Sequence, residues 1–288
     1  MIARIRRILS LLQCAATEWY SDNASTTGAA LAFYCAFSIA PLLVILLTVA
    51  GLFFSQRTAD TQVAAQMAAL FGPATARTLL GAVRSARHAQ GIAATIVSIV
   101  TLVIGATTVL AALQQALEVI WRSGALAVTG VRGWIRTRLL SFGLILTLAF
   151  LLLISLALSA ALSSLRSRFV ALHPAMAATL AVGDFALTLL LVAALFALIY
   201  RYMPARRLPW KTVIAGGLVT AVLFDAGHWA VGLYLAHSTE PSAYGAASSF
   251  AALLLWLYYT SQIFLFGAEF TSCLAGLRAR GPAPSHSH

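Results

Sequence analysis

The chain has 288 residues, of which 61% are hydrophobic and 9% are charged, and its formal net charge is +11. Soluble domains carry about 25% charged residues, so this composition excludes a soluble globular protein and indicates helices embedded in a membrane. No break in composition marks a second domain, which favours one polytopic, all-α membrane domain over residues 25–277. Its apolar stretches are long enough for six transmembrane helices, expected at about 28–54, 92–120, 139–162, 175–202, 212–236 and 245–275.

The basic residues are distributed according to this topology. Thirteen of the 19 Lys and Arg residues fall in the N-terminal segment, the second and fourth connections and the C-terminal tail. Because cytoplasmic loops carry an excess of Lys and Arg, we expect both termini in the cytoplasm. The charge therefore predicts membrane lipids as partners, with anionic lipid at the basic cytoplasmic turns, and no nucleic acid.

The first 24 residues differ from the spans that follow. Residues 1–24 combine apolar residues at helical spacing with Arg4, Arg6 and Arg7, a pattern that predicts an amphipathic helix on the inner membrane surface. Residues 55–90, between the first two spans, are expected to form a helical outer loop. At the other end of the chain, residues 278–288 are expected to be a disordered cytoplasmic tail.

The first two spans each contain a local pattern with a structural meaning. Pro41 lies at the middle of the first span, where it predicts a kink, and Ser38 is placed to satisfy part of the backbone that proline frees. Transporters often build their sites at broken helices near the bilayer midplane, so both residues join the candidate pathway. At the end of the second span, Glu118 and Arg122 are four residues apart, which predicts a structural ion pair.

The fifth expected span carries a carboxylate near its middle. Gly217, Ala221, Asp225, His228 and Gly232 recur at steps of three or four residues and share one helical face. Small residues allow close helix approach, so this face is expected to look into protein. A charge at the bilayer centre costs at least about 2.5–3.5 kcal/mol, which makes such an acid a functional hypothesis. The alternative is that the acid is a protonated packing residue or the hydrogen-bond partner of the histidine.

The sixth expected span has a continuous polar face. Tyr259, Gln262 and Glu269 lie on it, and we interpret the first two as wall residues of a substrate pathway. Glu269 and Asp225 occupy different depths, an arrangement that suits proton or cation coupling. The alternative is structural, with Glu269 capping a neighbouring helix or binding a basic turn.

The chain shows no pattern typical of a catalytic or metal site. Its six histidines are dispersed, and no Gly-rich phosphate loop or nucleophile elbow is present. This argues against nuclease or other enzymatic activity, and no cofactor or metal is expected. The cysteines are far apart and match no metal spacing, so we expect three free thiols, namely Cys14, Cys35 and Cys273.

Several motifs resemble one family. They are LAFYCAFSIAPLL at 31–43, RYMP at 201–204, FDAG at 224–227, SAYG at 242–245 and the block ending in GAEF at 267–270. Over residues from about 20 to 277 the chain is similar to the YihY/BrkB family of bacterial inner-membrane proteins. The resemblance implies six spans with both ends inside and an acidic residue at position 225. Members are linked to serum resistance, to a mistaken ribonuclease BN label and to suspected lipid or envelope-precursor export.

Together these observations predict a transporter or exporter in the bacterial inner membrane. Its substrate would be amphiphilic or lipid-linked and would enter between the first, fifth and sixth spans. Asp225 would be the binding or coupling acid and Glu269 the inner relay. The alternative is a membrane scaffold for envelope assembly that recruits partners through its basic turns. Small-residue faces would also permit a homo-oligomer.

Overall fold

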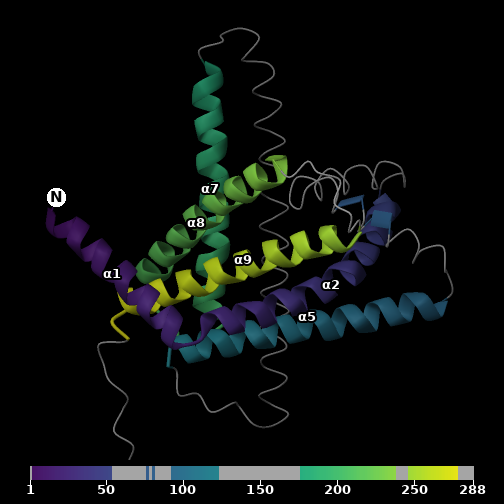
Figure 1. The fold of residues 1–288 in the computed structure, drawn as a ribbon, viewed down its shortest axis with the longest axis horizontal. Helices are drawn as coiled ribbons and strands as arrows, with labels where there is room; N and C mark the ends of the chain where they lie inside the picture. The colour runs from purple at the N-terminus through teal and green to yellow at the C-terminus, as the bar shows by residue number, and fades with distance from the viewer. Residues whose placement is uncertain are drawn as a thin grey trace, which may run out of the picture. The chain divides into compact units, whose positions relative to one another are not determined.

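The computed structural model describes residues 2–53, 76–77, 80–81, 92–122, 176–237 and 246–277 (Figure 1). The regular structure in these ranges is α-helical, which confirms the all-α class. The helices are α1 (Ile2–Ser21), α2 (Ala24–Phe53), α5 (Ile92–Ile120), α7 (Met176–Tyr202), α8 (Trp210–His237) and α9 (Ala246–Leu274). The expected third span, the tail and nearly all of the expected outer loop lie outside the described residues.

The helices have the length and composition of membrane-spanning segments. Within the described ranges, α7, α8 and α9 each contain an apolar stretch long enough to cross a bilayer, at Phe185–Tyr202, Trp210–Ala230 and Phe250–Leu274. Shorter apolar stretches lie in α2 and α5, at Ala24–Ile39 and Thr108–Ile120. In hydrocarbon every backbone polar group must be satisfied within the segment, which an α-helix does. These helices confirm a membrane protein.

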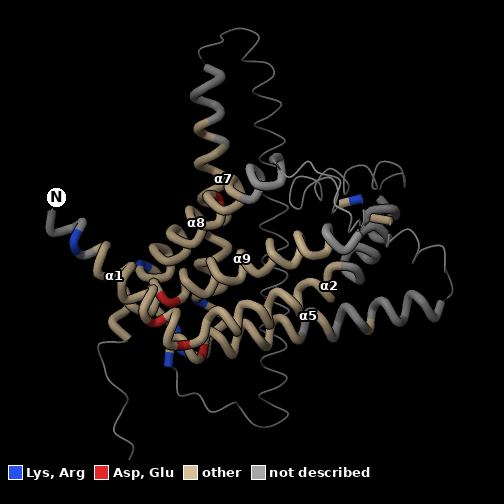
Figure 2. Tube along the Cα trace, viewed as in Figure 1, with Lys and Arg blue, Asp and Glu red and all other residues tan. Residues whose placement is uncertain are grey.

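The chain divides into two compact units that alternate along the sequence. Unit 1 contains Met1–Asp22, Gln114–Asp225 and Ile263–His288, and unit 2 contains Asn23–Leu113 and Ala226–Gln262. Among the side chains that the structure describes, every Lys, Arg, Asp and Glu except Arg77 belongs to unit 1 (Figure 2). Unit 1 is therefore where the charged chemistry of the described chain is found.

Unit 1 is built on a reciprocal contact between α8 and α9. Gly216 of α8 lies against Thr271 of α9, and Gly267 of α9 lies against Thr220 of α8, so closely that a methyl group on either glycine would overlap the facing hydroxyl. Each threonine donates its own proton one turn back, Thr220 to Gly216 O at 2.8 Å and Thr271 to Gly267 O at 2.7 Å. The residue numbers of the facing pairs rise along α8 and fall along α9, so these two helix segments run antiparallel.

Aromatic side chains fill the space beside this crossing. Tyr200 of α7 is fully buried, and its ring centroid lies 5.3 Å from that of Phe264, 5.9 Å from that of Trp121 and 6.4 Å from that of Phe196. On its other side α8 meets α7, because Gly217 has no side chain to separate it from the backbone of α7 at 193–197. Glycine on two adjacent faces of α8 thus lets it contact two helices at once.

The predicted ion pair between Glu118 and Arg122 is wrong, because α5 ends between the two residues. The helix ends at Ile120, and Arg122 has a φ of 44°, which turns it out of helical register. Arg122 pairs with Glu18 of α1 at 3.7 Å, whereas Glu118 accepts a hydrogen bond from Gln114 at 2.9 Å. The i, i+4 rule requires both residues to be helical, so it does not apply once the second residue lies beyond the helix end.

The expectation of three free thiols is wrong for two of them. Cys14 of α1 and Cys273 of α9 form a disulfide, with their Cα atoms 6.3 Å apart, and Cys35 is free. The two cysteines are separated by 259 positions in the sequence. Only the packing of α1 against the end of α9 brings them together, which no local spacing could indicate.

The α8–α9 crossing gives a prediction about stability. Gly267→Ala places a methyl group against the Thr220 and Tyr200 hydroxyls, and overpacking of this kind costs about 1–3 kcal/mol. We expect a lower thermal unfolding midpoint for the purified protein in detergent. Gly183→Ala is the matched control because no described residue lies within 4 Å of the added methyl group. Equal midpoints for the two variants would show that the crossing is looser than described.

Candidate functional site

Asp225 lies at the edge of a buried face of α8. Gly217 and Ala221 are buried, as expected for a face that looks into protein, but Asp225 itself is exposed. Each residue turns a helix by about 100°, which places Asp225 between Ala221 and the exposed side of α8. On that side Leu218 is 42% exposed and Val222 is 50% exposed. The predicted face is therefore buried at Gly217 and Ala221 and exposed at Asp225. The Asp225 carboxylate lies next to an exposed apolar surface of α8.

Glu269 has the opposite environment. Its side chain on α9 is completely buried, with 0% of its surface exposed. Three hydroxyl side chains of the same two helices are equally buried, those of Thr220, Thr271 and Ser272. Burial of a polar group costs free energy unless it is hydrogen-bonded, so a cluster of this kind is unusual inside an apolar bundle.

A pair of buried hydroxyl groups, those of Tyr200 and Thr220, lies beside the α8–α9 crossing. The Tyr200 hydroxyl lies 3.0 Å from Thr220 Oγ1 and donates to Phe264 O at 2.7 Å, and Thr220 Oγ1 donates to Gly216 O at 2.8 Å. Each hydroxyl has one proton to donate. Three contacts, namely Tyr200–Thr220, Tyr200–Phe264 O and Thr220–Gly216 O, therefore share two protons, so one of the three is without a proton at any moment. The pair can therefore rearrange its hydrogen bonds without any atom moving far.

Sequence reasoning missed these hydroxyl residues, although a signal was present. Glycine and threonine recur four residues apart on both helices, at Gly216 and Thr220 and again at Gly267 and Thr271. Spacing by four places both residues on one face, and small residues mark faces where membrane helices meet. Tyr200 carries no comparable signal, because an aromatic residue near a span end is common.

The crossing also fixes the relative depth of the two acids. Gly216 faces Thr271 and Thr220 faces Gly267, so Glu269 lies at the level of residue 218 on α8. Asp225 is seven residues further along, which is about 10 Å at 1.5 Å per residue. The Tyr200–Thr220 hydroxyl pair falls between these two levels. The two carboxyl groups therefore lie at separate levels along the helices, and Glu269 projects from the side of α9 opposite to the hydroxyl pair.

Two of the other predicted site residues, His228 and Tyr259, are helix contacts in unit 2. The His228 ring lies edge-on to Trp256, with 5.6 Å between centroids. Tyr259 lies directly against Gly227, which has no side chain to displace it. Both therefore hold the later part of α8 on the earlier part of α9.

The remaining predicted residues of unit 2 lie on α2 or contact it. Gln262 donates to Ser25 O at 3.2 Å and lies against Gly28, which ties α9 to the start of α2. Ser38 donates to Tyr34 O at 2.9 Å and lies against Gly105 of α5. Pro41 falls within the continuous helix α2, and its side chain lies outside the described ones.

The turn between α7 and α8 forms a basic-aromatic surface. The Arg201 guanidinium donates to Leu208 O, which closes the turn, and lies 5.4 Å from the centre of the Trp210 ring. Arg207 lies 5.9 Å from the centre of the Tyr202 ring. The exposed members of this surface are Tyr202, Arg206, Arg207, Trp210 and Lys211. Within the described ranges, no three His, Cys, Asp or Glu side chains gather as a metal site requires.

Comparison with known proteins places this arrangement in a family. The family model described as Virulence factor BrkB matches residues 15–287. A UPF0761 membrane protein of Rhodospirillum centenum is 36% identical over 143 residues, covering 49% of this chain and 31% of the relative. Another, of Stenotrophomonas maltophilia, is 26% identical over 272 residues, covering 91% of this chain and 60% of the relative. No solved structure matches.

The chain thus spans 31% to 60% of the length of these two relatives. The family match contains Asp225, Glu269, the basic-aromatic surface and Cys273, and it begins one residue after Cys14. It also contains all the motifs on which the resemblance was based. The chain belongs to the BrkB virulence-factor family of membrane proteins.

Proposed function

We propose that this protein is a transporter or exporter of an amphiphilic or lipid-linked envelope substrate in the bacterial inner membrane. The observation that carries the proposal is the complete burial of the Glu269 carboxyl group among membrane helices. Removing an ion from water costs several kcal/mol unless nearby groups compensate. Ionisable groups at such positions mark ion and substrate pathways, which supports proton or cation coupling.

The separation of the two acids supports a stepwise pathway. Asp225 is exposed, and an ionised carboxylate facing lipid at mid-span would be costly. It would therefore face a water-filled path, a second copy of the chain or a part of the chain outside the described residues. The Tyr200–Thr220 hydroxyl pair lies between the levels of the two acids, on the side of α9 that faces α8. Glu269 projects from the other side of α9, so a proton path between the acids would need water to complete it. The basic turns would face the cytoplasm, in line with the distribution of Lys and Arg.

The surroundings of Asp225 favour an amphiphilic substrate. Leu218 and Val222 are exposed on the adjoining side of α8. A molecule that meets this face would contact hydrocarbon side chains and a carboxylate together. A lipid-linked or amphiphilic compound has an apolar part that matches the hydrocarbon side chains. Its hydrogen-bonding or cationic head matches the carboxylate.

A second function, that of an envelope scaffold, is favoured by the basic-aromatic surface. Arg206, Arg207 and Lys211 are exposed beside two exposed aromatic rings. Such a surface attracts anionic lipid headgroups or acidic partners. In this alternative the two carboxylates are structural, and the α7–α8 turn is the functional part of the molecule.

Transport is tested with the purified full chain in proteoliposomes, reading internal pH and scrambling of a labelled lipid in parallel. Asp225→Asn and Glu269→Gln remove the charge and keep the shape of each side chain. We expect each to lower the active signal about tenfold or more, equivalent to raising the barrier by about 1.4 kcal/mol. Asp22→Asn, an acid outside the expected spans, is the control and should retain full rate. Full rate in all three variants would leave the scaffold as the better explanation.

Lipid binding at the turn is tested separately by thermal unfolding in detergent. Added phosphatidylglycerol should raise the unfolding midpoint of the wild-type protein, because lipid that binds the folded state stabilises it. Arg206→Ala with Arg207→Ala should lose most of this increase, and Arg206→Lys with Arg207→Lys should keep most of it. The same increase in both double variants would remove these arginines from the lipid site.

A further inference from the structure

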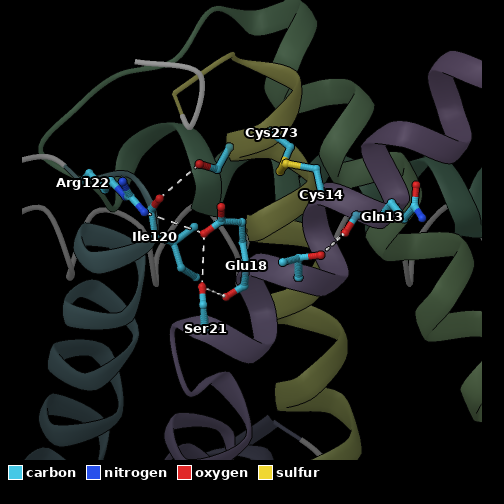
Figure 3. The surroundings of a disulfide bond; sticks show 9 residues. Gln13, Cys14, Glu18, Ser21, Ile120, Arg122 and Cys273 are labelled. Atoms are coloured by element: carbon cyan, nitrogen blue, oxygen red, sulfur yellow. Dashed lines mark hydrogen bonds and ion pairs between the residues drawn. A yellow bond between two sulfur atoms is a disulfide. The ribbon is translucent and has the colours of Figure 1, made fainter. Parts of the chain in front are cut away.

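The disulfide in unit 1 joins the amphipathic helix α1 to the last turn of α9. The Cα atoms of Cys14 and Cys273 are 6.3 Å apart, within the usual range for a disulfide. Figure 3 shows the bond beside the end of α5. There Ser272 donates to Ile120 O at 3.1 Å, and Arg122 lies 3.7 Å from Glu18. Three segments therefore meet at one point, and the disulfide is their covalent link.

The contacts of α1 at this point lie on a single face. Cys14 and Glu18 are four residues apart, so both project from the same side of the helix. Ala15 next to them is fully buried, whereas Ile8 and Leu9 are more than half exposed, at 54% and 57%. The face towards unit 1 is thus the one that carries the disulfide. Much of the remaining surface of α1 is apolar or basic and suits a lipid surface.

The disulfide is the covalent contact of α1 at this point, and it adds to the non-covalent packing of the helix. The Glu18–Arg122 pair is partly exposed on both sides, and exposed ion pairs contribute little. By contrast, Cys273 stands on a fixed element, because its neighbour Ser272 is buried and bonded to the end of α5. Oxidation or reduction of the two cysteines therefore changes how firmly α1 is attached.

The distribution of charge indicates the compartment, and so whether the two cysteines are kept reduced or oxidised. The proposed orientation places α1 and the end of α9 on the side rich in Lys and Arg, where thiols are kept reduced. Two cysteines that are close enough to form a disulfide in a reducing compartment are expected to change between the dithiol and the disulfide. We infer that Cys14 and Cys273 are a reversible dithiol–disulfide site that fastens α1 to unit 1 when oxidised and frees it for the lipid surface when reduced. This inference rests on the proposed orientation and on neither transport nor substrate.

The exchange needs a disulfide of the glutathione class as oxidant. One protein thiolate attacks that disulfide and forms a mixed disulfide, and the first small thiol leaves. The second protein thiolate then attacks the mixed disulfide and the second small thiol leaves. The two protons lost by the cysteines go to the two departing thiolates. Two electrons pass from the protein to the small disulfide, and a dithiol reductant reverses the change.

The experiment counts free thiols of the full chain in its native membrane. Cells are acid-quenched and the thiols are labelled with a maleimide polymer that shifts the gel band once per thiol. The Cys35→Ala background leaves only the pair to report. We expect two labels in untreated cells, none after oxidised glutathione is added to inside-out vesicles, and two again after dithiothreitol. Cys14→Ser and Cys273→Ser in the same background should each show one label in untreated cells and after dithiothreitol. After oxidised glutathione each can form only a mixed disulfide, which adds the mass of one glutathione, whereas the closed pair adds none.

Protease protection in the same vesicles reports the movement of α1. Cleavage within residues 2–21 should be slower when the pair is oxidised, and the oxidant should change nothing in Cys14→Ser. A pair that is fully oxidised in untreated cells, or that oxidised glutathione never closes, would overturn the inference, as would equal cleavage in both states. A protease-sensitive tag at the C-terminus reports orientation independently. A tag on the outer side would overturn the inference while leaving the transport proposal standing.

Discussion

The structure of unit 1 depends on the absence of side chains at two glycines. Membrane helices gain no hydrophobic energy by leaving lipid for each other, so close backbone approach and van der Waals contact must hold them together. Gly216 and Gly267 permit this approach, and the facing threonines fill the space that they leave. Each threonine hydroxyl is satisfied one turn back in its own helix. No unsatisfied hydroxyl is thus created where the two helices cross.

The same crossing explains how polar groups come to be buried beside it. Once α8 and α9 are in contact, the side chains on the facing surfaces lose access to the surroundings. Thr220 and Thr271 are then completely buried, and Tyr200 packs beside them from α7 through its bond to Phe264 O. Glu269 and Ser272 are equally buried, but they project from other sides of α9, where Ser272 donates to Ile120 O. The Glu269 carboxyl group is thus buried on a side of α9 that does not face α8. Its depth relative to Asp225 follows from the register of two Gly–Thr pairs.

Much of the fold could be predicted because membrane helices obey a length rule. The second span was expected at 92–120 and α5 covers Ile92–Ile120, while the fifth was expected at 212–236 and α8 covers Trp210–His237. The site was predicted less completely. Asp225 and Glu269 stand out in an apolar sequence, but Tyr200 and Thr220 do not. Their importance comes from contacts between α7, α8 and α9, which the sequence of any one helix leaves open.

The sequence by itself determined that this is a membrane protein, that it is helical and to which family it belongs. Composition, span length and motifs are local properties of the chain, so they can be read without a structure. Tertiary structure alone decided which polar groups meet. It paired Arg122 with Glu18 and joined Cys14 to Cys273, and it buried Glu269 while leaving Asp225 exposed. The physical reason is common to all of these. A helical face has several possible neighbours of equal apolarity, and only the matching of small residues across helices selects one of them.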